Sequence, residues 1–279
     1  MSRIRQIIFG TVRKLALLPL KLLPRRWKMS ELERLASDMV TEVTTGCGSI
    51  RFWCPSSLLA MRADTMFTKE PDMIAWIDSI DQGSVFWDIG ANVGVFSLYA
   101  ARKTKAVVLA FEPSAANFHV LVRNIQLNHL SDQVAAYCLA LSGQTELGVI
   151  NLASAEPGSA MSQFGRAGET SRYWGQEAIA THGMVGITVD DFIARFQPPF
   201  PTHLKMDVDG LEWPILQGAM ATLRDPRLKA VMVELSISNS DESAAAVQFL
   251  GAAGFRLESR GEEQGNAEES AANHLFVRA

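Results

Sequence analysis

The sequence predicts an α/β fold in which helices cover both faces of a doubly wound, mostly parallel sheet. Two observations carry this prediction. From residue 84 onward, short apolar runs alternate with helical segments of about ten to fifteen residues, a pattern typical of βαβ units. The last two apolar runs are joined by an acidic turn, which predicts an antiparallel hairpin at one edge of the sheet.

The expected elements follow from where each apolar run begins and ends. In chain order they are strands at 49–53, 85–89, 107–112, 134–139, 203–207, 230–235, 255–259 and 274–278, and helices at 70–79, 94–102, 115–127, 212–223 and 243–252. Residues 143–200 interrupt this alternation, with a strand expected at 146–151, a helix at 188–196 and otherwise irregular structure. A long insertion of this kind in a regular domain is typical of a substrate lid.

Composition and charge exclude several classes of protein. Apolar residues make up 48% of the 279 residues and charged residues 20%, which is typical of a soluble globular protein. The net charge is −4, but residues 1–30 carry eight Lys or Arg and no acid, so the remainder carries −12. Because nucleic-acid-binding proteins usually present a basic face, we expect no nucleic-acid partner.

The N-terminal segment differs from the rest of the chain. Residues 1–29 place apolar side chains at helical spacing, interrupted by basic residues and by Pro19 and Pro24. No uncharged apolar run in this segment approaches the roughly 18 residues that a transmembrane helix needs. A basic amphipathic segment is typical of peripheral contact with an anionic membrane face, and a helix packed on its own domain or on a partner is the alternative. We therefore expect a helical N-terminal extension over 1–64 and the main domain over 65–279.

The cysteines indicate the compartment. Cys47, Cys54 and Cys138 are odd in number and lack the CxxC spacing, so neither a disulfide framework nor a zinc site is expected. Free thiols are typical of a reducing cytoplasm. We expect a cytoplasmic protein, with the peripheral membrane contact of residues 1–29 at the inner face of the membrane.

A ligand-binding turn begins at Asp88, at the end of one expected strand. Gly90, Asn92 and Gly94 follow before the next helix, and glycines at such a turn let the backbone approach a ligand closely. Glu112 ends the next strand, where a carboxylate is suited to accept hydrogen bonds from both ribose hydroxyls. A ligand-free tight turn would explain the glycines alone, but not the two acids at matching strand ends.

The type of nucleoside cofactor follows from what this turn lacks. A dinucleotide enzyme requires G-x-G-x-x-G, whereas the middle position here is Asn92 and a third glycine is missing. An acid in front of the turn disfavours a pyrophosphate and suits a ligand with an amino group and a sulfonium. The cofactor predicted from these residues is S-adenosylmethionine.

A second polar stripe lies in the expected strand that begins at His203. His203, Lys205 and Asp207 alternate along one face, although a central parallel strand is normally apolar on both faces. Lys205 needs an acidic partner, for which Asp88, Asp207 and Glu234 are the candidates. Either an internal ion pair or a functional site explains the stripe. A metal site formed by His203, Asp207 and Asp209 is disfavoured, because EF-hand spacing is absent.

The candidate catalytic residues come from this stripe and from the insertion. Methyl transfer needs an aligned acceptor, and an alcohol acceptor would also need a group that takes its proton. Asp207 is the first candidate, His203 the second and His182 the third. Tyr173 and Trp174 would either stack on a flat acceptor or simply pack.

The chain resembles the FkbM family of methyltransferases. The matching stretches are EPDMIAWID (70–78), VFWDIGANVGVFSLYAA (85–101), AFEPSAANFHVLVRNIQLN (110–128), HLKMDVDGLEWPILQGA (203–219) and VMVEL (231–235). They keep the family's order over residues 65–240. The residue before Gly210 is Asp209, where the family more often has Glu, and residues 1–29 lie outside the resemblance.

The resemblance implies a class I, Rossmann-like methyltransferase fold with S-adenosylmethionine as methyl donor. It also implies an acceptor hydroxyl on a sugar, a surface glycan or a natural product, with O-methylation as the expected reaction. In this sequence the cofactor would lie against Asp88, Gly90, Asn92, Gly94 and Glu112, with Asp207 beside it. Two alternatives remain open: a dinucleotide or nucleotide-sugar enzyme on the same type of fold, and a non-catalytic membrane-associated scaffold.

Overall fold

The computed structural model describes residues 23–167, 178–236, 240–263 and 270–279, and the chain divides into two compact units, Met1–Val40 and Thr41–Ala279. The second unit thus begins well before residue 65, the expected start of the main domain. The reason is that side chains between residues 41 and 64 are buried against this unit. Ile50 and Phe52 of β2 (Gly48–Trp53), which pairs with β1 (Val40–Thr45), are buried, as are Leu59 and Ala63 of α4 (Ser57–Asp64).

The first unit contains helix α3 (Arg25–Ser37), which begins directly after Pro24 and has no buried residue. Its last turn carries exposed ion pairs from Arg34 to Glu31 at 2.7 Å and to Asp38 at 3.1 Å. Most of the segment expected to contact a membrane, residues 1–22, lies outside the described residues. In the described part of the chain, no helix is long and apolar enough to cross a membrane.

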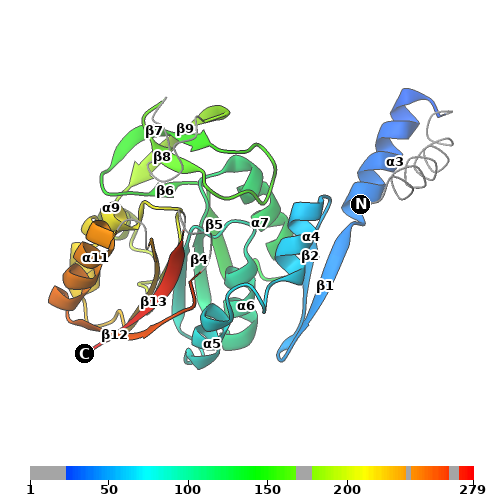
Figure 1. The fold of residues 1–279 in the computed structure, drawn as a ribbon. Coiled ribbons are helices and arrows are strands. Elements are labelled where there is room, and N and C mark those ends of the chain that lie inside the picture. The colour runs from blue at the N-terminus through cyan, green and yellow to red at the C-terminus, as the bar shows by residue number, and fades with distance from the viewer. Residues whose placement is uncertain (1–22, 168–177, 237–239, 264–269) are drawn as a thin grey trace. The chain divides into compact units, whose positions relative to one another are not determined.

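The central sheet confirms the predicted fold class. In the described residues it has seven strands in the order β12-β13-β11-β10-β3-β4-β5 (Figure 1). The five strands from β5 to β11 are parallel, and β13 runs antiparallel to both β11 and β12, as the edge hairpin requires. Their bounds are β3 (Val85–Ile89), β4 (Val107–Phe111), β5 (Val134–Tyr137), β10 (His203–Met206), β11 (Ala230–Ser236), β12 (Phe255–Arg260) and β13 (Ala271–Arg278).

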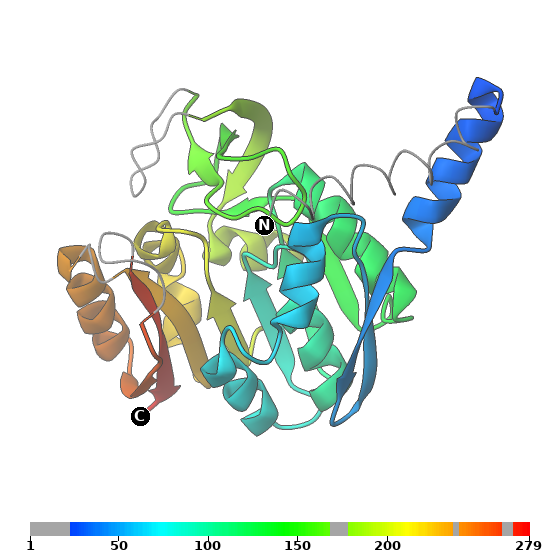
Figure 2. The same ribbon diagram turned by 45° about the vertical axis from the view of Figure 1, so that its right-hand side comes forward.

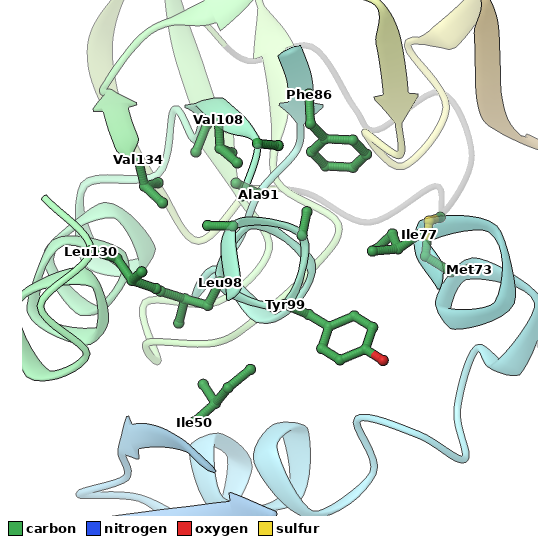
Figure 3. Close-up of a cluster of buried hydrophobic side chains, with 14 of the residues drawn as sticks. Ile50, Met73, Ile77, Phe86, Ala91, Leu98, Tyr99, Val108, Leu130 and Val134 are labelled. Carbon is green, nitrogen blue, oxygen red and sulfur yellow. The ribbon is translucent and has the colours of Figure 1, made fainter. Parts of the chain in front are cut away.

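Helices cover both faces of this sheet and create two hydrophobic cores. The first core includes side chains of α5 (Pro71–Ser79), α6 (Val95–Thr104) and α7 (Ala115–Leu127). Figure 3 shows α6 in the middle of the side chains of this core. The second core packs against α8 (Val189–Phe196), α9 (Glu212–Gln217), α10 (Met220–Arg224) and α11 (Ser240–Ala252).

The alternation of side chains along each strand divides them between the two cores. In β3, Phe86 packs in the first core, whereas Trp87 and Ile89 pack in the second. Successive side chains of a strand point to opposite faces, so a strand covered on both sides is apolar throughout. This explains why the mostly apolar runs of β3 and β4 lie inside the sheet, with Asp88 as the one charged side chain among them.

The insertion over 143–200 is more regular than the sequence predicts. Three strands of the described insertion pair with β6, which precedes it, in the order β6-β9-β7-β8, and Figures 1 and 2 show this small sheet beyond one end of the central strands. Only β7 (Glu146–Leu152) matches an expected strand; β6 (Ala140–Leu141), β8 (Gln163–Gly165) and β9 (Ala180–Ile187) do not. β6 and β8, with two and three residues, leave little periodicity to detect, and β9 contains Gly183 and Gly186 and few buried side chains.

One expected helix, 212–223, is divided into α9 and α10 at Gly218 and Ala219. A Cβ at Gly218 would lie 2.7 Å from the carbonyl oxygen of Ser142. The glycine therefore permits a close backbone approach to the start of the insertion, and it also weakens a continuous helix at this point.

Candidate functional site

A pocket lies at the carboxyl ends of the central parallel strands. The chain runs from β3 outward to β4 and β5, and later returns to β10 on the other side of β3. Such a reversal between neighbouring strands opens a crevice where ligands bind in open α/β sheets. Four of the predicted site residues line this pocket: Gly90, Asn92, Glu112 and Asp207.

The glycine turn brings two strand ends into contact. Gly90 has φ +81°, and a Cβ there would lie 1.8 Å from the carbonyl oxygen of Asp207. Only glycine therefore fits between β3 and the chain that leaves β10. Gly94 has φ +88° and precedes the first residue of α6, and its Cβ would meet Leu121 at 2.5 Å. Gly94 is not part of the pocket lining, and its lack of a side chain lets α6 pack closely on Leu121.

Glu112 is held at the end of β4 by backbone amides. The amides of Asn92 and Ser114 each donate to its carboxylate at 2.8 Å, and Asn117 Nδ2 donates at 3.5 Å. Burial raises the pKa of Glu112 to about 7 against these hydrogen bonds, which lower it. Oε1 accepts the Ser114 and Asn117 hydrogen bonds, whereas Oε2 accepts only that of the Asn92 amide and keeps a lone pair for a ribose hydroxyl.

Lys205 and Asp88 form a buried ion pair beneath the pocket. Lys205 Nζ lies 3.1 Å from Asp88 Oδ1 and 3.5 Å from Asp207 Oδ2, and it donates to the carbonyl oxygen of Gly90 at 2.9 Å. Asp88 has no exposed surface and does not line the pocket. Two of the predicted acidic partners of Lys205 are thus present. Asp88 is linked to the glycine turn through Lys205, which donates to the Gly90 carbonyl.

An acidic cluster surrounds Asp207. The Asp207 side chain is 26% exposed and forms a hydrogen bond with Glu234. Although burial raises the pKa of Asp207, Lys205 and Lys69 lower it below its usual range. The neighbouring Asp207 and burial raise the pKa of Glu234 well above its usual value. Asp207 is therefore ionised at neutral pH, and Glu234 retains a proton to higher pH.

The structure does not bring the other two candidate bases to this pocket. His203 is the first residue of β10, about 13 Å of extended chain before Asp207. Its Nδ1 lies 2.9 Å from Thr202 Oγ1, and burial lowers its pKa to about 4. His182 lies on β9 and is absent from the described pocket lining. Tyr173 and Trp174 lie outside the described residues.

Several pocket residues were not predicted. Arg62 and Lys69 come from α4 and the chain after it, Ser159 comes from the insertion, and Glu234 was considered only as a partner of Lys205. The signal for Glu234 is present in the sequence, since it is the acid near the end of the apolar run AVMVEL. No local pattern marks Arg62 or Ser159, because distant contacts place them.

A loop of the insertion covers the glycine turn. Asn92 Nδ2 and Asn117 Nδ2 donate to the carbonyl oxygen of Ser159 at 2.9 and 3.0 Å, and the Met161 amide donates to Asp209 Oδ2 at 2.5 Å. These contacts tie residues 158–162 to the carboxyl ends of the strands. The pocket therefore has a sheet side and a cover side.

The residues present fit S-adenosylmethionine. The lining contains five carboxyl groups and three cations, a balance that suits a ligand with a sulfonium and an ammonium group; these are Glu70, Glu112, Asp207, Asp209 and Glu234 against Arg62, Lys69 and Lys205. The buried Asn92 Oδ1 has no partner among the described residues, so it is free to accept from a ligand. Across the described chain, no three His, Cys, Asp or Glu side chains are arranged to hold a metal ion.

Comparison with known proteins adds independent findings. The chain is 23% identical over 220 residues to the hexuronic acid methyltransferase AglP of Haloferax volcanii, which covers 78% of this chain and 83% of AglP. A shorter stretch of 56 residues is 48% identical to methyltransferase sdnD of Sordaria araneosa, covering 20% of this chain and 22% of that protein. A precorrin-6y C5,15-methyltransferase of Geobacter metallireducens has a TM-score of 0.45 at 13% identity, covering 78% and 93% of the two chains.

The methyltransferase FkbM domain matches residues 88–257, which is more than half of the chain and includes both strand-end motifs. This match confirms two predictions, methyltransferase activity and S-adenosylmethionine as the methyl donor, and it disfavours the dinucleotide-enzyme and scaffold alternatives. The chain belongs to the FkbM methyltransferase family.

Proposed function

We propose that this protein transfers a methyl group from S-adenosylmethionine to a hydroxyl oxygen of a sugar, with a hexuronic acid as the first candidate acceptor. The observation that carries this proposal is the partly exposed Asp207 in an acidic pocket beside the glycine turn. The similarity to a hexuronic acid methyltransferase supports the class of acceptor. A surface glycan or a natural product with the same group would present the same chemistry.

The sheet side of the pocket is assigned to the methyl donor. We assign the ribose hydroxyls to Glu112 and the amino-acid part to the turn at Gly90 and Asn92, because these groups line the pocket at neighbouring strand ends. Lys205 and Asp88 keep their positioning role, since Lys205 Nζ donates to the Gly90 carbonyl. When bound, S-adenosylmethionine supplies a methyl group already activated on a sulfonium.

Asp207 and Glu234 are assigned to the acceptor hydroxyl. Asp207 accepts the hydrogen bond of the hydroxyl and thereby aligns its oxygen with the reacting carbon. As the oxygen forms its new bond to carbon, its proton passes to the carboxylates of this pair, and the carbon–sulfur bond breaks. A carboxyl with a raised pKa, as in Glu234, is the better proton acceptor near neutral pH once it is ionised.

The predictions on location and partners remain proposals. We place the reaction in the cytoplasm and expect peripheral membrane contact through residues 1–29. Salt-sensitive binding of the full chain to anionic vesicles, lost when the basic residues of this segment are replaced, would support the contact.

The test is methyl transfer from labelled S-adenosylmethionine to p-nitrophenyl β-D-glucuronide. We expect transfer by the wild type, a loss of about a hundredfold or more in kcat for Asp207→Asn, and a smaller loss with a shifted pH profile for Glu234→Gln. Unchanged kcat in Asp207→Asn would reject the assigned role of Asp207. Transfer to neither the glucuronide nor other hydroxyl acceptors would reject the proposed reaction.

A further inference from the structure

The cover side of the pocket contains a guanidinium group without a carboxylate partner. Arg62 lies in the last turn of α4 and lines the pocket. Its Nε donates to the carbonyl oxygen of Gly158, and its two terminal nitrogens form no hydrogen bond or ion pair with any residue that the structure describes. Arg62 therefore presents four N–H donors to the pocket.

The surrounding chain fixes the position of Arg62. Ser56 caps α4 by accepting from the amide of Leu59 at 3.3 Å, and Leu59 is buried, so the helix is fixed on its core side. Gly158 has φ +89°, and a Cβ there would lie 2.9 Å from Leu59 Cδ2 and 3.6 Å from Arg62 Nε. The glycine thus lets the insertion approach α4 closely enough for its carbonyl to orient the guanidinium.

A guanidinium that is removed from water costs free energy unless it is paired. The carboxylates that act on Arg62 electrostatically, among them Asp207, Asp209 and Glu112, are not within ion-pair distance in the described structure. Lys69, the other cation on this side, is paired with Glu70 at 2.9 Å. The planar fork of an arginine matches a carboxylate better than any other ligand group except phosphate.

We infer that Arg62 binds a carboxylate of a bound ligand and so forms an anion subsite in the pocket that Asp207 also lines. Two ligands of the proposed reaction carry this group, the hexuronic acid acceptor and the amino-acid part of S-adenosylmethionine. The inference rests on the proposed function only for the acceptor, because the donor is already given by the family. The same chemistry would apply in both cases, and the experiment separates them.

The experiment compares Arg62→Gln with a matched control, Arg51→Gln. Arg51 is also half-buried and donates to a backbone carbonyl, that of Leu127, but it lies outside the pocket lining. Each protein is titrated with S-adenosylmethionine and with 5′-methylthioadenosine, which lacks the amino-acid part. In the presence of S-adenosylhomocysteine, each is also titrated with p-nitrophenyl β-D-glucuronide and with the uncharged p-nitrophenyl β-D-glucoside.

If the acceptor supplies the carboxylate, Arg62→Gln weakens binding of the glucuronide about tenfold or more and leaves the glucoside and S-adenosylmethionine unchanged. If the donor supplies it, Arg62→Gln weakens S-adenosylmethionine by a similar factor and leaves 5′-methylthioadenosine unchanged. Equal affinities of the wild type and Arg62→Gln for both carboxylate ligands would overturn the inference. Absence of glucuronide methylation by the wild type would instead count against the sugar acceptor, while the donor titrations still test Arg62.

Discussion

The two sides of the pocket are built in different ways. On the sheet side, Gly90, Glu112 and Asp207 each follow a buried parallel strand within a few residues. On the cover side, Arg62 and Ser159 are placed by contacts between segments about a hundred residues apart in the chain, such as Arg62 with Gly158. The buried strands therefore fix the residues of the sheet side. The residues of the cover side depend instead on how the insertion packs on the main domain.

This difference suggests a division of labour. Ends of central strands are rigid and suit a donor that is the same in every reaction. Insertions and loops vary more easily and suit the recognition of a particular acceptor. Substitutions on the sheet side are therefore expected to change stability and donor binding, and those in the insertion to change acceptor recognition, while the titrations of Arg62→Gln show which ligand Arg62 binds.

The largest effect is expected for Gly90→Ala on the sheet side. The new Cβ would overlap the carbonyl oxygen of Asp207, 1.8 Å away. The alanine would also have to adopt φ +81°, which is unfavourable for a residue with a side chain. We expect a loss of about 4 kcal/mol or more in the free energy of unfolding, measured by urea denaturation. Gly83→Ala is the matched control, since Gly83 has φ +75° but no atom within 4 Å of a Cβ, and should cost about 1 kcal/mol. Equal losses in both variants would show that the close approach at Gly90 is relaxed in solution.

The next effect is expected for Lys205→Met, which leaves the fully buried Asp88 unpaired. We expect a loss of about 3 kcal/mol in the free energy of unfolding. The double variant Lys205→Met/Asp88→Leu removes both charges and should regain most of this stability, but not the binding of S-adenosylmethionine, because the Gly90 carbonyl has lost its donor. Full recovery of binding in the double variant would contradict the positioning role of the pair.

A smaller effect is expected from pH through buried carboxyls of the sheet side. Burial raises the pKa of Glu212 from 4.5 to about 7. A carboxyl whose pKa is higher in the folded than in the unfolded state stabilises the fold below pH 4.5, and this contribution is lost as the pH rises through about 7. We expect Glu212 to contribute a decline of about 2 kcal/mol in ligand-free stability between pH 4.5 and 7.5.

Urea denaturation across this pH range measures that decline. Glu212→Gln keeps an oxygen that can accept from the amides of Val208 and Gly210, but it no longer titrates. Its stability should therefore depend less on pH than that of the wild type. Identical pH profiles would contradict the raised pKa of Glu212.

The smallest effect on stability is expected on the cover side, for Gly186→Ala in β9. A Cβ there would lie 2.4 Å from the ring of Phe164, which lines the pocket. Phe164 must shift, so we expect a loss of about 1 kcal/mol in stability, unchanged donor binding and a several-fold higher KM for the acceptor. Gly183→Ala, where a Cβ meets nothing within 4 Å, is the control. A weaker affinity for S-adenosylmethionine in Gly186→Ala would break the proposed division of the pocket.

The same division explains what could be predicted from the sequence. The apolar runs of β3 and β4 and the helix of α7 were expected within one residue of their bounds, because periodicity and capping act locally. The position of Asp207 and Glu112 in one pocket could be predicted, since strand ends in a parallel sheet meet at one edge. The distance of His203 from that pocket could not, because sharing a strand face with Asp207 does not bring it to the same end of the strand.

The residues that sequence analysis missed depend on distant contacts. The small sheet pairs residues up to 46 positions apart, such as Ala140 with Gly186, and its strands β6 and β8 have only two and three residues. Nothing in the local sequence distinguishes Arg62 from other helical arginines, because its hydrogen-bond partner, the carbonyl of Gly158, is distant in the chain. Asp88 and Gly94 were recognised by position, but the structure gives them packing and positioning roles outside the pocket lining.

The most direct test of the account is calorimetric titration of the wild type, Glu112→Gln, Asp207→Asn and His203→Gln with S-adenosylmethionine. His203→Gln serves as the control, since His203 is buried at the opposite end of the strand that leads to Asp207. We predict binding by the wild type and by His203→Gln with equal affinity, and a loss of about tenfold or more in Glu112→Gln, with a smaller loss in Asp207→Asn. Equal binding by all four proteins, or a loss confined to His203→Gln, would contradict a donor site at the carboxyl ends of β3, β4 and β10.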